Sequence, residues 1–124
     1  MNWSSLAAVL LGLAVILGAF GAHVLQSRLD SSLLGVYRGG VTYQFIHALG
    51  LLVVSALTKT GHLRPKVANW VCGLLLLGIV LFSGSLYLLA ITGIETLGVI
   101  TPIGGFAFIA GWFLLAWGLT QKVD

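Results

Sequence analysis

The sequence predicts an all-α integral membrane protein, a bundle of four transmembrane helices that forms a single domain over residues 1–124. Hydrophobic residues make up 59% of the chain and charged residues only 7%, against about half and about a quarter in soluble globular proteins. Six basic and three acidic side chains are too few to cover the surface of a soluble domain of this size. The apolar residues also fall in four long blocks, each near the ~20 residues that cross a bilayer as a helix.

The first block, residues 4–25, predicts a retained transmembrane helix. A secretory signal peptide would have a basic n-region and an apolar core of about 7–15 residues. This block has no basic residue before it, and its apolar core is longer. Ala14, Gly18 and Ala22 recur at every fourth position, which gives a smooth face for close helix packing. We interpret that face as a contact within the bundle, with a dimer contact as the alternative.

The second transmembrane helix is predicted over residues 41–58, after a more polar interval. Within that interval a short helix lying in the membrane interface is expected at about 29–38, since its apolar residues fall on one helical face. Gly39 and Gly40 would end that helix. An irregular loop over the same residues is the alternative.

The third and fourth helices are predicted over residues 67–91 and 101–119. Pro65 suits the first turn of the third helix, where a missing N–H costs nothing. Thr101 and Pro102 suit the N-cap and first position of the fourth helix.

Four crossings place both termini and the second connection on the same side of the membrane. That side carries Lys59, Arg64, Lys66 and Lys122, and the other side carries Arg28 and Arg38. The positive-inside rule therefore predicts that both termini are cytoplasmic.

Polar side chains from all four helices are expected at one depth, near the outer leaflet and facing the bundle interior. The predicted cluster consists of His23, Tyr43, Gln44, His47, Ser83, Tyr87 and Thr101. His23 and His47 are expected to lie within direct or one-water hydrogen-bonding reach of each other. Because ionisable residues inside a membrane commonly mark functional sites, the first hypothesis is a site for the polar head of an amphipathic small molecule or lipid.

The alternative hypothesis is that the histidines only fix helix packing. The protein would then be an accessory or assembly subunit of a larger membrane complex. Its small-residue faces would contact a partner protein or a second copy. Membrane lipids are expected partners in either case, and the dispersed net charge of +3 gives no indication of nucleic-acid binding.

Metal and catalytic sites are less favoured by the residue pattern. A zinc site needs three or four protein ligands. His62 is expected in the cytoplasmic connection, on the opposite side of the membrane from His23 and His47, and no apolar block contains a carboxylate. Paired acids for acid–base catalysis are lacking, and serines such as Ser83 and Ser85 are ordinary packing residues in membranes. No metal, cofactor or catalytic residue is predicted.

Four stretches together give a family resemblance that covers nearly the whole chain. They are Gly18-Ala19-Phe20-Gly21-Ala22-His23, Tyr43-Gln44-Phe45-Ile46-His47-Ala48-Leu49, Phe82-Ser83-Gly84-Ser85-Leu86-Tyr87 and Thr101-Pro102-Ile103-Gly104-Gly105. The chain resembles the YgdD/YwdK-like small membrane proteins of unknown function (DUF 423), whose eukaryotic relatives are called transmembrane protein 256. The resemblance implies a four-helix protein, in the inner membrane in bacteria. It implies no activity and no site residues.

Overall fold

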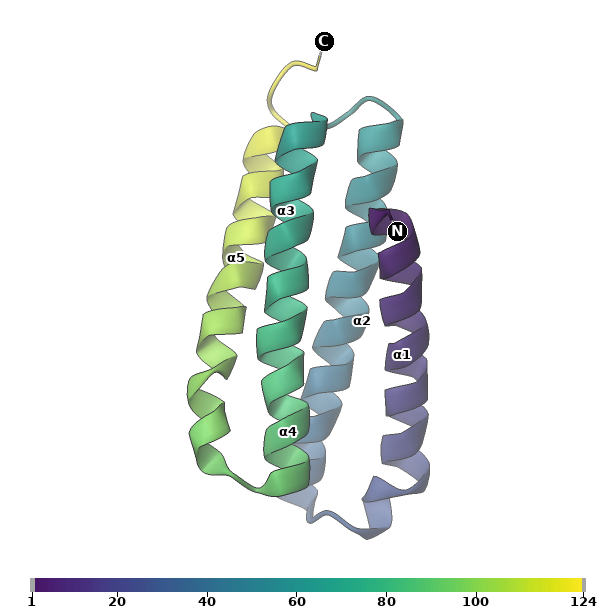
Figure 1. The fold of residues 1–124 in the computed structure, drawn as a ribbon, viewed down its shortest axis with the longest axis vertical. Coiled ribbons are helices and arrows are strands. Elements are labelled where there is room, and N and C mark those ends of the chain that lie inside the picture. The colour runs from purple at the N-terminus through teal and green to yellow at the C-terminus, as the bar shows by residue number, and fades with distance from the viewer. Residues whose placement is uncertain (1, 124) are drawn as a thin grey trace.

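The computed structural model describes residues 2–123, which form four antiparallel helical columns (Figure 1). The elements are α1 (Trp3–His23), the 3-10 turn η1 (Leu25–Ser27), α2 (Ser31–Lys59), α3 (Pro65–Gly78), the π-helical turn η2 (Ile79–Ser83), α4 (Gly84–Thr92), the 3-10 turn η3 (Glu95–Val99) and α5 (Thr101–Gly118). The four columns 3–27, 31–59, 65–92 and 95–118 are each long and apolar enough to span a membrane. The predicted all-α bundle of four membrane helices is confirmed.

Side-chain caps and a glycine set several of the helix ends. The Asn2 side chain accepts a hydrogen bond from the Ser5 N–H at the start of α1. Asp30 Oδ1 accepts one from the Leu33 N–H, at 2.8 Å, at the start of α2. Both are N-caps of the usual type. Gly93 ends α4 with φ of +70°, a left-handed conformation in which glycine has no steric penalty.

The prediction of a separate interfacial helix at 29–38 is wrong, and so is the alternative of a loop. Helix α2 begins at Ser31 and continues without a break through Gly39 and Gly40. A Cβ atom added at Gly40 would lie 2.7 Å from Tyr87 Cε1, so this glycine provides room for a neighbouring helix. Glycine inside a helix costs about 1 kcal/mol in intrinsic propensity, and tertiary packing overrides that cost here.

In the view of Figure 1 the columns follow one another as a row with α5 and α1 at the two edges, and side chains of α2 and α5 also meet, as His47 stacks on Phe108. Helix α1 packs chiefly on α2, α2 also packs on α3, η2 and α4, and α3 packs on α5. Both described chain ends and the connection 60–64 lie at one end of the row, which we call the terminal end. The connections that follow α1 and α4 lie at the opposite end, which we call the far end.

The small-residue face of α1 differs from the predicted one. The fully buried small residues of this helix are Ala7, Ala14 and Gly21, which recur at every seventh position. Gly18 is only half-buried and Ala22 is exposed. The contact with α2 therefore follows a seven-residue repeat, as expected for two helices that pack at a small crossing angle.

Close packing at Gly104 predicts a large cost for the smallest side chain. An added Cβ would contact the backbone nitrogen of Phe82 and would lie 2.8 Å from the Phe82 Cβ. We expect Gly104→Ala to lower the free energy of unfolding by about 1–3 kcal/mol, because backbone atoms cannot move aside cheaply. Unfolding by dodecyl sulfate in mixed micelles, followed by circular dichroism, measures this change.

Gly12→Ala is the matched control, since no heavy atom lies within 4 Å of the added Cβ. We expect this variant to be neutral or up to about 1 kcal/mol more stable, as helix propensity favours alanine. Equal stability of the two variants would contradict close packing of α5 on η2.

Candidate functional site

Gln44 is the centre of a polar network at mid-length of the bundle. Its side chain is 3% exposed. The amide Nε2 donates a hydrogen bond to the Leu10 carbonyl of α1 at 2.8 Å, and Oε1 accepts one from the Tyr87 hydroxyl of α4 at 2.6 Å. One side chain thus links three of the four columns.

Three more hydrogen bonds, made by four hydroxyl groups, join neighbouring columns at this level or nearer the far end. Ser83 Oγ donates to the Gly40 carbonyl at 2.7 Å. Ser85 Oγ and Thr101 Oγ1 lie 2.6 Å apart and connect α4 with α5. Nearer the far end, the Tyr37 hydroxyl donates to the carbonyl of a residue in α1, Leu17, at 2.5 Å.

His47 is buried among aromatic rings between α2 and α5. Its Nδ1 lies 2.8 Å from the Tyr43 carbonyl oxygen. Because a carbonyl oxygen can only accept, Nδ1 carries the hydrogen. The imidazole stacks on Phe108 with ring centroids 3.5 Å apart, and Trp112 lies at 5.8 Å. The Tyr43 ring is 41% exposed and packs against Phe82 at 4.5 Å.

The expected approach of His23 to His47 is wrong. The hydrogen bonds from Gln44 to Leu10 and from Tyr37 to Leu17 fix the register of α1 against α2. His23 lies thirteen residues beyond Leu10, so it is about 20 Å along the helix axis from the level of Gln44 at 1.5 Å per residue. His23 is also exposed.

The structure therefore groups only part of the predicted cluster. Hydrogen bonds join Ser83 and Tyr87 to α2, where Gln44 lies, and another joins Thr101 to Ser85. Tyr43 and His47 lie beside them against the rings of Phe82 and Phe108. The group lies near mid-length of α2 rather than at the start of a helix, because α2 begins ten residues earlier than expected. Within residues 2–123, every fully buried side-chain nitrogen or oxygen has a hydrogen-bond partner.

A surface cleft near the far end lies between α1 and α2. It has a volume of about 220 Å³ and is lined by Gly18, Gly21, Ala22, Tyr37, Arg38, Val41 and Thr42. We call it the far-end cleft. Arg38 is exposed and lies seven residues after Ser31, so its Cα is about 10 Å inside the start of the helix.

Arg38 has no carboxylate partner in the described part of the chain, where Asp30 and Glu95 are the acidic residues. Asp30 caps the start of α2, two helical turns away from Arg38. The sequence analysis placed Arg38 in the expected interfacial helix at 29–38, or in a loop, and so outside the membrane-spanning segments. The signal that would have placed it in the second membrane helix is the apolar spacing 34, 37, 41, 48 and 51, which continues across Gly39 and Gly40.

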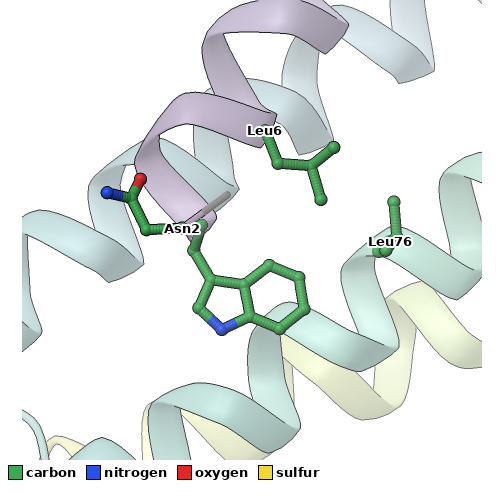
Figure 2. A pocket seen from close by; sticks show the side chains of 4 residues that line it. Asn2, Leu6 and Leu76 are labelled. Carbon is green, nitrogen blue, oxygen red and sulfur yellow. The ribbon is translucent and has the colours of Figure 1, made fainter.

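Other clefts lie toward the terminal end, among them a small one of about 140 Å³ that is lined by Lys59, Ser55 and Thr58 together with residues of α1 and α3. Another, of about 300 Å³ between α1 and α3, is lined by Asn2, Trp3, Leu6 and Leu76. The side chains of Leu6 and Leu76 border the same space from two helices (Figure 2). Trp3 Nε1 bridges these helices by donating to Asn69 Oδ1 at 2.9 Å. A further cleft, between α3 and α5, is lined by Arg64, Lys66, Val67, Trp70, Leu114 and Trp117.

No group of three or more His, Cys, Asp or Glu side chains suited to a metal ion occurs among residues 2–123. The buried polar side chains are held in hydrogen bonds within the bundle. The cations Arg38, Arg64 and Lys66 line surface clefts, where a ligand can reach them.

The bond between Tyr87 and Gln44 predicts a measurable contribution to stability. We expect Tyr87→Phe to lower the free energy of unfolding by about 0.6–1.7 kcal/mol, the range that interhelical hydrogen bonds contribute in membrane proteins. A double-mutant cycle with Gln44→Leu, read from unfolding in mixed micelles, isolates the pair. Tyr43→Phe is the control, because its hydroxyl has no hydrogen bond within the described residues, and we expect it to be neutral. A coupling energy of zero would contradict the bond.

Comparison with known proteins places this architecture in a family. The family described as "Protein of unknown function (DUF423)" matches residues 17–105. The UPF0382 membrane protein YwdK of Bacillus subtilis is 50% identical over 105 residues, which cover 83% of each chain. A UPF0382 membrane protein of Staphylococcus saprophyticus is 49% identical and covers 86% of each chain. A UPF0382 membrane protein of Staphylococcus haemolyticus is 49% identical over 79% of this chain and 78% of its own.

No solved structure matches the chain. The family match spans well over half of the residues and includes Arg38, Gln44 and Tyr87. The four helical columns account for the membrane location that the relatives' names state. The chain belongs to the DUF423 family of membrane proteins of unknown function.

Proposed function

We propose that this membrane protein binds an anionic amphiphile of lipid type in the far-end cleft between α1 and α2. The observation that carries the proposal is Arg38, a cation within a membrane-spanning helix that lines a cleft and lacks an acidic partner among residues 2–123. Arg38 is the eighth residue of the 29-residue α2, so it costs a fraction of the about 2.5–3.5 kcal/mol that a charge costs at the helix centre on insertion scales. A bound anion would offset part of that cost.

The ligand chemistry follows from the guanidinium group. Its planar fork of N–H donors matches the two oxygens of a phosphate or a carboxylate. Thr42 lines the same cleft and adds a hydroxyl one helical turn from Arg38. A phospholipid and a fatty acid share this anionic head, and the experiment below separates them.

The small residues that line the cleft leave room for the acyl chain of a lipid whose anionic head lies at Arg38. Gly18, Gly21 and Ala22 line its α1 side with no atom beyond a Cβ. An added Cβ would lie 3.5 Å from Val41 Cγ1 at Gly18 and 2.6 Å from Tyr37 Cε1 at Gly21, so α1 and α2 are in close contact at the floor of the cleft. The volume of about 220 Å³ fits part of one chain, and the rest of the lipid would stay in the bilayer.

The proposed ligand class is the one expected from the sequence, but the proposed residues differ. The groups of Gln44, Ser83 and Tyr87 are bonded to other protein groups. We therefore assign them the role of holding α1 and α4 against α2, which forms one wall of the cleft. The amphiphile-binding role moves to Arg38 and Thr42.

We further infer that the terminal end faces the cytoplasm in the cell membrane. Lys59, Arg64, Lys66 and Lys122 belong to that end, and Arg28 and Arg38 belong to the far end. The excess of basic residues supports this orientation. The far-end cleft would then open to the outer leaflet.

Arg38→Gln tests the ligand site. We expect the variant to bind phosphatidylglycerol or oleate about tenfold more weakly, the loss that corresponds to one charge-assisted hydrogen bond of about 1.4 kcal/mol. Native mass spectrometry of the full chain, titrated with each amphiphile separately, measures both affinities and distinguishes phosphate from carboxylate heads.

Arg28→Gln is the charge-matched control at the same end, because Arg28 lies outside the cleft, and we expect unchanged affinity. Ala22→Phe should reduce binding without removing a charge, since Ala22 is exposed and lines the cleft. Equal loss in Arg28→Gln and Arg38→Gln, or no loss in Arg38→Gln, would refute the site.

A cysteine placed at Ser27 or at Thr120 tests the orientation. We expect a membrane-impermeant maleimide to label the Ser27→Cys variant in intact cells and to label Thr120→Cys only after lysis. Both positions are exposed, and the native Cys72 is buried. The reverse pattern would invert the assignment and place the far-end cleft in the inner leaflet.

A further inference from the structure

The geometry points to a second lipid site at the terminal end, where the cleft between α3 and α5 binds the headgroup of an anionic phospholipid. This site shares no residue with the far-end cleft, so it goes beyond the proposed function and does not depend on it. Its volume is about 430 Å³.

The floor and sides of this cleft are apolar. Val67 and Leu114 are half-buried between α3 and α5. Trp70 is 63% exposed and Trp117 is 53% exposed, and each comes from a different helix. Tryptophan is enriched at the level of lipid headgroups, where its ring contacts chains and its N–H contacts polar groups. A ring from each helix can therefore pack against the upper part of an acyl chain.

The rim of the cleft is cationic. Arg64 is the N-cap residue of α3, and Lys66 is the second residue of that helix. The Arg64 Nε donates to the Lys122 carbonyl oxygen at 2.9 Å, which holds the guanidinium group at the mouth of the cleft and leaves its terminal nitrogens available for another acceptor. Lys66 is exposed beside it.

Charge complementarity selects the occupant. Within residues 2–123 the acidic side chains are Asp30 and Glu95, and both lie at the far end, one before α2 and one in η3. The described part of the terminal end therefore offers Arg64 and Lys66 no carboxylate. Basic pockets between membrane helices commonly bind anionic headgroups, and the apolar floor favours a lipid over a free anion.

Titration of the full chain with phosphatidylglycerol tests the site, with the chain held in micelles and bound lipid counted by native mass spectrometry. We expect Arg64→Gln and Lys66→Gln each to weaken binding at this site by roughly fivefold, as one basic residue near an anionic headgroup contributes. The double variant should lose both factors, and phosphatidylcholine binding should not change.

Lys59→Gln is the matched control, since it removes one charge at the same end but lies outside the cleft. It should retain phosphatidylglycerol affinity, and so should Arg38→Gln at this site. The site is refuted if Lys59→Gln causes the same loss as Lys66→Gln, which would indicate diffuse attraction, or if the double variant binds like the parent. Circular dichroism of each variant confirms that these surface changes leave the helices folded.

Discussion

The close approach of α4 to α2 at Gly40 is the contact on which the other interhelical contacts depend. In a bilayer the lipid chains are as apolar as the helix surfaces, so helices associate through close packing and hydrogen bonds. The missing Cβ of Gly40 admits the Tyr87 ring, and the Gly40 carbonyl accepts the Ser83 hydroxyl. From that position the Tyr87 hydroxyl reaches Gln44, whose amide in turn holds Leu10 of α1. Helix α1 packs chiefly on α2 and is therefore tied into the bundle by the same chain of bonds.

The π-helical turn η2 (Ile79–Ser83) changes the direction in which the residues after it face, relative to the residues of α3. A π turn inserts one extra residue into a helix and so rotates the following helix by about 100° relative to the preceding one. Here the turn separates α3, which packs on α5, from α4, which packs on α2. Ser83 faces Gly40, whereas Ser85 faces Thr101. Residues two apart lie about 200° apart around any helix, so the turn sets how this pair of serines lies relative to α3.

Hydropathy and block length were enough to predict the four crossings, because the bilayer requires long apolar helices. The prediction from local sequence was wrong at Gly39 and Gly40, because helix propensity alone predicts that two adjacent glycines end a helix. These glycines allow interhelical contact with Ser83, Leu86 and Tyr87, which lie more than forty residues later in the chain. Because of this single error, Tyr43, Gln44 and His47 were expected at the start of a helix and not in its middle. Arg38 was expected in the interval between two membrane helices. The same error led to the expectation that His23 and His47 lie at the same depth in the membrane. The π turn has no signal in the sequence that local reasoning could use.

The distribution of polar groups separates a closed interior from an open perimeter. Inside the bundle the amide and hydroxyl groups are taken up by protein acceptors and donors, as fully buried polar atoms within residues 2–123 have partners. The two described carboxylates, those of Asp30 and Glu95, lie at the far end, and Asp30 is the N-cap of α2. The cations Arg38, Arg64 and Lys66 are thus left at clefts that open sideways between helices. Where two neighbouring helices face lipid, such cations are accessible to the surrounding headgroups. Their depth in the membrane is set by their positions along the helices. The fully buried polar atoms among residues 2–123 already have hydrogen-bond partners, so the cations at these surface clefts are the groups best placed to meet a polar ligand in a protein whose described residues lie mostly in four helices long enough to span a membrane.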